Sequence, residues 1–206
     1  MANDDAISAR GGVLPVGYPF GIFKKNFYRL TTGVAAANVF IGQLMDLDAN
    51  GRAFFATIGS GSQTIGPALG FLDTSLASLP SAMLSLTQAS YLPGNTDAFV
   101  LVADDPEQDF VVQEDTGGTA LTASEVGQTA NWIFRSTSGS TTTGYSTIEL
   151  DRSTVSSSTT NALFIKQLGR HMNSDGTDNA FGNYSKIVVK LMNHRFHDTA
   201  GRPTPI

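Results

Sequence analysis

Apolar and polar residues alternate over many short stretches of the chain, and turn-forming Gly, Ser, Asn, Asp or Pro bounds each stretch. A period of two is typical of β-strands that bury one face. Strands of this length and spacing predict an all-β fold built from barrel-like or sandwich-like modules of short antiparallel strands, with at most short helices. The expected strands are 39–47, 52–58, 63–72, 82–87, 99–103, 109–113, 130–135, 145–150, 162–170 and 185–196.

Several of the expected turns carry a specific signal. The dipeptide Asn50-Gly51 predicts a type I′ hairpin turn, because both residues tolerate positive φ. Pro106 predicts a tight reversal over residues 104–108. Thr122 and Glu125 form a capping-box pattern for one brief helix that ends at Gly127. The hydroxyl-rich runs Ser136–Gly144 and Ser153–Thr160 are expected to be loops.

The first thirty residues differ from the rest of the chain. Residues 1–21 contain too many Gly and Pro residues for a regular element, so an extended arm is expected over residues 1–30. Its apolar side chains favour burial, either on another protein or on the arm's own domain. At its end, residues 22–30 fit a short helix and residues 26–32 fit a strand equally well. Two β modules follow, over residues 31–90 and 91–206.

Composition narrows the class of protein. Only 15% of residues are charged, and Ser and Thr replace the missing charge, which argues against a coiled coil or a helical bundle. Residues 31–134 carry eleven acidic residues and a single basic one, Arg52, whereas both ends are mildly basic. A nucleic-acid binder concentrates Lys and Arg on one surface, so no nucleic-acid partner is expected.

Other features remove whole classes of function. The chain has no Cys, which excludes disulfides, thiol nucleophiles and Cys-ligated metals. No apolar stretch approaches the ~20 residues of a membrane span, so no membrane partner is expected. The first ten residues lack the basic and apolar regions of a secretory signal, and a soluble protein is expected.

Three groups of residues could in principle form a metal-binding or catalytic site. Residues 46–51 match the start of an EF-hand calcium loop, but Thr57 stands where the bidentate Glu is needed, so a hairpin is favoured. The acidic residues of 104–109 could supply paired carboxylates, yet a solvated turn is favoured. His194 and His197 could bind a metal if the chain turns between them, but a surface role is favoured.

No nucleotide or hydrolase motif is present. The Ser-rich runs lack a G-x-S-x-G elbow, and the Gly-rich turns match neither the dinucleotide nor the Walker pattern. No catalytic residue, metal site, cofactor or small-molecule substrate is therefore expected.

Three stretches of the sequence carry a shared set of strand and turn motifs. Residues 39–73 hold a strand ending in Asp, an Asn-Gly hairpin and a Gly-rich return, and FVLVADDPEQDFVVQED follows at 99–115. A long Ser/Thr hairpin region at 140–170 precedes the closing KIVVKLMNHRF at 186–196. In combination these stretches resemble the capsid cement, or head decoration, proteins of tailed bacteriophages of the podophage and cyanophage type.

The resemblance implies a non-enzymatic virion protein. Such a protein binds the outside of the icosahedral head and bridges subunits of the major capsid protein, commonly as a homotrimer at three-fold positions. It would assemble in the host cytoplasm, in agreement with the expected lack of a signal. The DNA packed inside the head presses outward on the shell, and the protein would resist this pressure by bridging capsid subunits. The many identical contacts that it makes would add through multivalency.

The end of the arm is the expected contact with the shell. Its basic residues can pair with acidic shell residues, and its aromatic residues provide apolar anchors. Deletion of residues 2–30 is expected to abolish head binding and to leave the modules folded. The expected capsid-binding residues are Phe20, Phe23, Lys24, Lys25, Phe27, Tyr28 and Arg29.

Two other functions stay open on the sequence alone. A tail or head-fibre component would bind a host glycan around the Ser136–Thr160 loops and Trp132. A β-fold hydrolase would use Asp104, Asp105 or Asp109.

Overall fold

The computed structural model describes residues 12–16, 24–30, 37–59, 61–73, 91–94, 96–171, 173 and 175–197. Within these ranges the protein is nearly all β: thirteen strands form three sheets, and the only helical element is the 3-10 turn η2 (Ala123–Glu125). Every ladder between named strands is antiparallel. The expected all-β class is confirmed, but over the described residues the sheets do not close into barrels.

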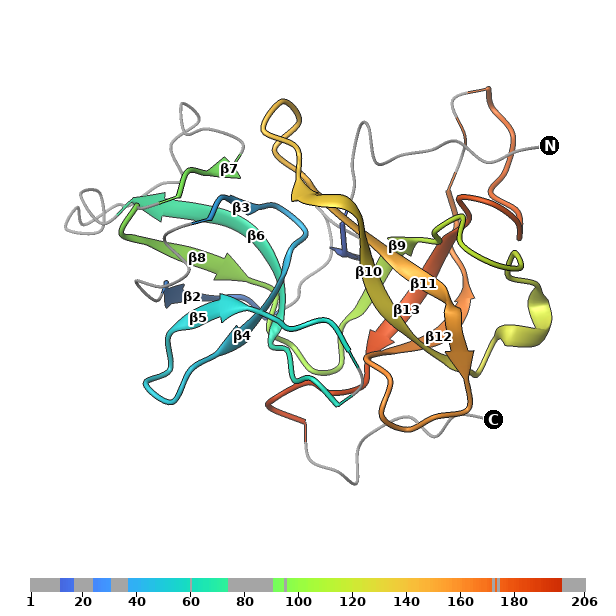
Figure 1. Ribbon diagram of the computed structural model, residues 1–206, viewed down its shortest axis with the longest axis horizontal. Helices are drawn as coiled ribbons and strands as arrows, with labels where there is room; N and C mark the ends of the chain where they lie inside the picture. Colours follow the sequence, from blue (N-terminus) through green and yellow to red (C-terminus); the bar gives the residue numbers. More distant parts are fainter. Residues whose placement is uncertain are drawn as a thin grey trace.

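The two larger sheets lie side by side (Figure 1). The six-stranded sheet encloses a core that includes Trp132 and Phe110, both buried. The order of its strands is β1 (Leu14–Pro15), β9 (Asp109–Gln113), β13 (Lys186–Leu191), β12 (Leu163–Leu168), β10 (Thr129–Gly139) and β11 (Ser146–Ser156).

The five-stranded sheet has its own core, which is mainly aliphatic and includes Met45, Ile65 and Val100. A separate two-stranded sheet pairs β3 (Val39–Phe40) with β7 (Tyr91–Leu92). The order in the five-stranded sheet is β2 (Asn26–Arg29), β8 (Ala98–Val102), β6 (Gly66–Asp73), β4 (Leu44–Leu47) and β5 (Ala53–Phe55).

The sheets do not follow the expected division of the chain at residues 30 and 90. Strand β8 comes from the expected second module, yet it pairs with β6 and β2 in the five-stranded sheet. Both β1 and β2 come from the expected arm, and they pair with β9 and β8 respectively. At residues 26–29 the chain is therefore a strand and not a helix. Burial of apolar side chains explains why β8 pairs in this sheet, because its Val100 and Val102 face the core of the five-stranded sheet.

The hydroxyl-rich runs are partly strand, so the expectation of loops was wrong for Ser136–Gly139 and Ser153–Ser156. Strand β10 continues to Gly139 and β11 to Ser156. These ends extend beyond the apolar core, where most of the side chains are exposed or half-buried. Exposed strand ends show no apolar alternation, and the hydroxyl composition therefore concealed them.

The turn after β4 is a hairpin, as expected, but not of type I′. Of its two signal residues only Gly51 has positive φ, at 72°. The Gly51 N–H donates to the Asp48 carbonyl at 3.0 Å, and Asp48 N–H donates to the Arg52 carbonyl at 2.9 Å. This is the pattern of a type I turn followed by a left-handed glycine. The Asp48 carboxylate accepts from the Asn50 and Arg52 N–H groups, each at 2.8 Å, and so holds the turn.

The capping box is confirmed. Both reciprocal bonds of Thr122 and Glu125 are present, and they begin η2. The reversal at Pro106 is confirmed as well, with Gln108 N–H donating to the Asp105 carbonyl at 3.1 Å.

Backbone hydrogen bonds join the two sheets at one junction near the β10–β11 hairpin. Ile41 N–H donates to the Gly144 carbonyl at 3.0 Å, and Ser146 N–H donates to the Ile41 carbonyl at 2.8 Å. Nearby, Val13 N–H donates to the Gly42 carbonyl at 3.0 Å. The residues after β3 are thus tied to the six-stranded sheet.

A second junction lies after β13. Thr64 N–H donates to the Asn193 carbonyl at 3.1 Å, and Arg195 N–H donates to the Thr64 carbonyl at 2.9 Å. The Arg195 guanidinium also binds both carboxylate oxygens of Asp46 in β4, at 2.7 and 2.8 Å. A bidentate pair of this kind fixes orientation as well as distance.

Candidate docking surface

The described part of the expected contact segment consists of Lys24, Lys25 and strand β2, which lies at one edge of the five-stranded sheet. Side chains of a strand alternate between its two faces. Phe27 and Arg29 therefore share one face, and Asn26 and Tyr28 share the other. The alternation divides the expected contact residues into two groups with different surroundings.

The outward group is exposed, as are the two lysines before the strand. The Phe27 side chain is 47% exposed, and Lys24 and Lys25 just before the strand are exposed. Arg29 is exposed and pairs with Asp97 at 2.8 Å. Phe20 and Phe23 lie outside the described residues.

Phe27 lies beside other apolar side chains on the same face of the sheet. In the sheet register Phe27 lies opposite Leu101, and Arg29 lies opposite Phe99, which in turn lies opposite Leu72 of β6. Directly opposite residues share a face. Leu101 and Leu72 are buried but belong to neither core cluster. This sheet therefore has apolar side chains on both faces.

The second group forms hydrogen bonds within the protein, although Asn26 is exposed and Tyr28 is half-buried. The Tyr28 hydroxyl donates to Asp104 Oδ2 at 2.5 Å, and the Asn26 amide nitrogen donates to the same oxygen at 2.7 Å. Burial, followed by the hydrogen bond and charge of Asp104, raises the pKa of Tyr28 above its usual range. Tyr28 thus fastens β2 to the end of β8, a role that its place among aromatic residues did not signal.

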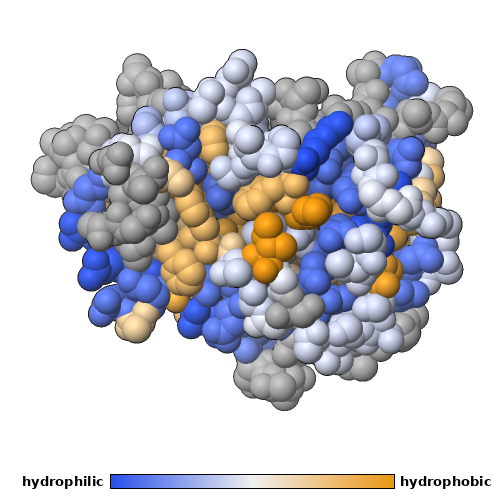
Figure 2. All heavy atoms as spheres, in the orientation of Figure 1, coloured by the Kyte–Doolittle hydropathy of each residue, from blue (hydrophilic) through white to orange (hydrophobic). Residues whose placement is uncertain are grey.

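Apolar side chains are also exposed elsewhere, so exposure alone does not define the surface. Figure 2 shows apolar residues gathered in the middle of the viewed face and over the region of β4 and β5. What sets Phe27 apart is its position on an edge strand beside three basic residues. The other large apolar residues exposed within the described ranges are Val16, Ile58, Ile133 and Phe196.

The four acidic residues of the β8–β9 turn do not form a paired carboxylate site. Asp105 caps the turn by accepting from Glu107 N–H at 3.0 Å. Glu107 pairs with Lys190 and His197, and the Lys190 hydrogen bond lowers the pKa of Glu107. The Asp104 carboxylate accepts hydrogen bonds from Tyr28 and Asn26. The Asp109 carboxylate pairs with Lys166.

The two neighbouring histidines also serve different contacts. His194 is buried, and its Nε2 lies 2.9 Å from the Ile65 carbonyl at the second junction. Burial lowers the pKa of His194, which favours the neutral ring. His197 contacts Glu107 instead, at 2.8 Å. Among the described residues no three acidic or histidine side chains gather as metal ligands.

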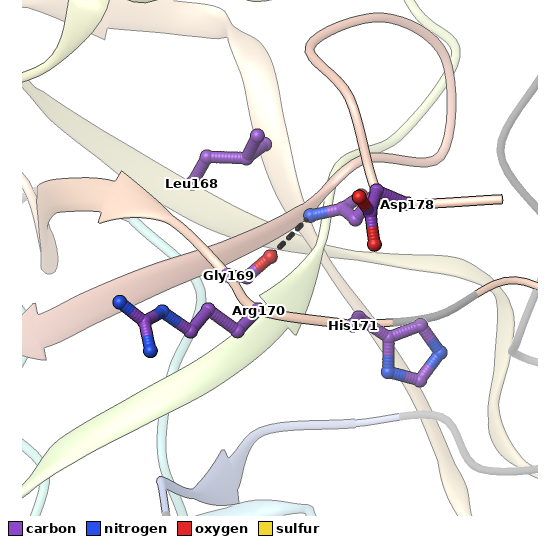
Figure 3. A pocket seen from close by; sticks show the side chains of 6 residues that line it. Leu168, Gly169, Arg170, His171 and Asp178 are labelled. Carbon is purple, nitrogen blue, oxygen red and sulfur yellow. Dashed lines mark hydrogen bonds between the residues drawn. The ribbon is translucent and has the colours of Figure 1, made fainter.

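A hollow of about 510 Å³ lies beside the end of β12 (Figure 3). Asn179 fixes its wall by donating to the Gly169 carbonyl at 2.7 Å. Arg170, His171 and Asp178 are exposed, and in Figure 3 Arg170 extends away from the other two. Their side chains do not converge on one point.

Trp132, to which the glycan alternative assigned a role, is 2% exposed and packs edge-on against Phe134 with ring centroids 5.4 Å apart. A buried indole cannot stack on a sugar.

No protein-family model matches the chain, and comparisons with curated proteins and with solved structures give no significant match. Within the described ranges, no helix has the length and apolar composition needed to cross a membrane.

Proposed function

We propose that the protein is a capsid cement protein of a tailed bacteriophage. It binds the outer surface of the icosahedral head as a homotrimer and bridges subunits of the major capsid protein. In this role it assembles in the host cytoplasm, remains part of the virion and performs no catalysis. The proposal rests on the sequence resemblance together with the geometry of the β2 edge.

The observation that carries the proposal is the exposed face of β2. Only β8 forms a ladder with Asn26–Arg29 among the described residues, and Leu30 adds a single bridge to Ala53. An edge strand offers backbone N–H and C=O groups to another chain. Phe27 adds an aromatic side chain of the kind that dominates binding energy at protein interfaces.

Charge supports a protein partner for this face. Lys24, Lys25 and Arg29 flank Phe27, whereas residues 31–134 contain eleven acidic residues and one basic residue. A locally basic patch on an acidic protein steers the molecule so that this patch meets an acidic surface. Three copies in a trimer would present three such patches, and their contacts would add through multivalency.

The test uses point substitutions, because deletion of residues 2–30 would remove β1 and β2 together with the buried side chain of Val13. We expect Phe27→Ser to weaken binding to heads that lack the protein by about 30-fold or more, as for loss of an aromatic anchor. Phe196→Ser is the matched control, since Phe196 is the same residue type and is 51% exposed. Binding is measured by co-sedimentation, and folding by circular dichroism.

Unchanged binding of a folded Phe27→Ser protein would contradict the assignment of the β2 face. Failure of the unaltered protein to bind these heads would contradict the cement function itself. Charge reversal at Lys24 and Lys25 should weaken binding most at low salt, because salt screens exposed charges.

A further inference from the structure

A second surface feature lies where the β10–β11 hairpin reaches the β3–β7 pair (Figure 1). Strand β10 carries a large bulge there: Phe134 lies opposite Ile148, but the next paired residue, Gly139, lies opposite Ser146. More residues occupy β10 than β11 over this interval, so Ser136, Thr137 and Ser138 leave the ladder. Bulges re-aim side chains and are over-represented beside functional sites.

Hydrogen bonds from β11 hold the bulge in shape. The Ser146 hydroxyl donates to the Ser138 carbonyl at 3.0 Å, and the Thr147 hydroxyl donates to the Thr137 carbonyl. The Thr137 hydroxyl donates to the Gly139 carbonyl at 3.1 Å. Both anchoring residues on β11 are buried. The bulge is thus preorganised, which reduces the ordering cost of binding a ligand.

The bulge forms one wall of a groove of about 450 Å³, within the roughly 300–1,000 Å³ typical of small-molecule sites. Gly139 packs directly against the Phe40 ring, because a Cβ atom on Gly139 would come within 2.2 Å of it, and this buried ring stacks on Tyr91. All the described residues that line the groove are uncharged, and most carry a hydroxyl. They are Asn38, Phe40, Ser136, Thr137, Ser138, Gly139, Ser140, Thr141 and Thr147.

Several polar groups of the groove remain able to bind a ligand. The hydroxyls of Ser136, Ser138 and Thr141 have no hydrogen-bond partner among the described residues. The side-chain oxygen Oδ1 of Asn38 accepts from Gly94 N–H at 3.0 Å, which leaves the side-chain nitrogen Nδ2 of Asn38 to donate to a ligand. The groove therefore contains hydroxyls that hold the bulge and hydroxyls that have no partner among the described residues.

We propose that this groove binds a neutral saccharide of one or two sugar residues. Each protein hydroxyl can donate and accept, as sugar hydroxyls do, so the two sets can satisfy one another. The uncharged lining disfavours ionic ligands, which would lose hydration without gaining a partner charge. The site goes beyond the cement function and does not depend on it.

The test is a chemical-shift titration of the full-length 15N-labelled protein with maltose, lactose, cellobiose and N,N′-diacetylchitobiose. At least one of these neutral disaccharides should shift the amides of residues 136–141 and 38–40, with a Kd in the millimolar range or tighter. We expect Ser136→Ala and Thr141→Val each to weaken binding by about fivefold, the equivalent of one neutral hydrogen bond. Thr142→Val is the matched control, because Thr142 is exposed on the same hairpin tip but does not line the groove.

The proposal is overturned if none of the four disaccharides shifts these amides, or if the shifted amides lie elsewhere. It is also overturned if Thr142→Val weakens binding as much as Thr141→Val does. Shifts caused only by a Ser/Thr-rich peptide would assign the groove to a polypeptide and would likewise contradict the saccharide.

Discussion

The two larger sheets use arginine in opposite ways. In the six-stranded sheet, the side chains of Arg152 and Glu114 are only 4% and 0% exposed, and they pair at 2.8 Å. In the five-stranded sheet, Arg29 and Asp97 pair at the same distance with side chains that are 58% and 54% exposed. Equal distances thus describe one pair shielded from water and one pair in water, where the attraction is much weaker.

The buried pair organises a whole loop. The Arg152 guanidinium also donates to the carbonyls of Thr116, Gly117 and Gly118, at 2.7 to 3.0 Å. Glu114 in turn accepts from Leu121 N–H at 3.0 Å. A buried polar network therefore holds a loop of the six-stranded sheet in place. The β2 edge of the five-stranded sheet instead has its apolar and basic side chains on the surface. Under the proposed function, the six-stranded sheet is the scaffold and the five-stranded sheet meets the partner.

The largest expected effect comes from breaking the buried network. Arg152→Met should lower the free energy of unfolding by about 3–5 kcal/mol, because it leaves the buried Glu114 carboxylate without the opposite charge that it pairs with. Urea denaturation of the purified protein measures the change. A decrease of less than about 1 kcal/mol in the free energy of unfolding would show that the buried Arg152 network does not stabilise this sheet.

An intermediate effect is expected at the junction between the sheets. Burial lowers the pKa of His194 below its ordinary value of 6.5, so the unfolded chain binds this proton more readily than the folded protein does. Stability should therefore fall as the pH decreases through 6.5, by up to about 1.4 kcal/mol per pH unit. Nearby Asp104 and Asp105 oppose the shift, and His197 adds to it.

His194→Gln tests this expectation, because the glutamine amide can still donate to the Ile65 carbonyl. The pH dependence between about 5 and 7 should flatten in this variant and persist in His171→Gln, whose histidine is exposed. If the free energy of unfolding of His194→Gln depends on pH as it does in the unaltered protein, a group other than His194 causes the dependence.

The smallest effect is expected at the exposed pair. Arg29→Met should change stability by about 0.2–1 kcal/mol, as is usual for ion pairs in water. Its effect on head binding should exceed its effect on stability, because Arg29 flanks Phe27 on the exposed face. A stability loss comparable to that of Arg152→Met would remove the contrast between the two sheets.

Local signals in the sequence predicted local structure well. The strand at 109–113, the capping box at Thr122 and the turn at Pro106 are where they were expected. Pairing between distant segments was not predictable, because β8 has apolar residues that suit either sheet. Only the folded register shows that it lies between β2 and β6.

The candidate surface was predictable in part. Aromatic and basic residues mark the segment around β2, but the alternation that turns Tyr28 inward depends on its being a strand. The partner of Tyr28, Asp104, lies 76 residues away in the chain. For the groove, the Ser/Thr run was the visible signal, while the contribution of Asn38 and Phe40 depends on the junction between the sheets.

The most direct test of the proposed cement function is a cryo-electron microscopy reconstruction of phage particles that contain this chain. We predict density for the two-sheet protein on the outside of the head lattice, with the β2 edge against the major capsid protein. A head map without such density, from particles that contain the chain, would contradict the account.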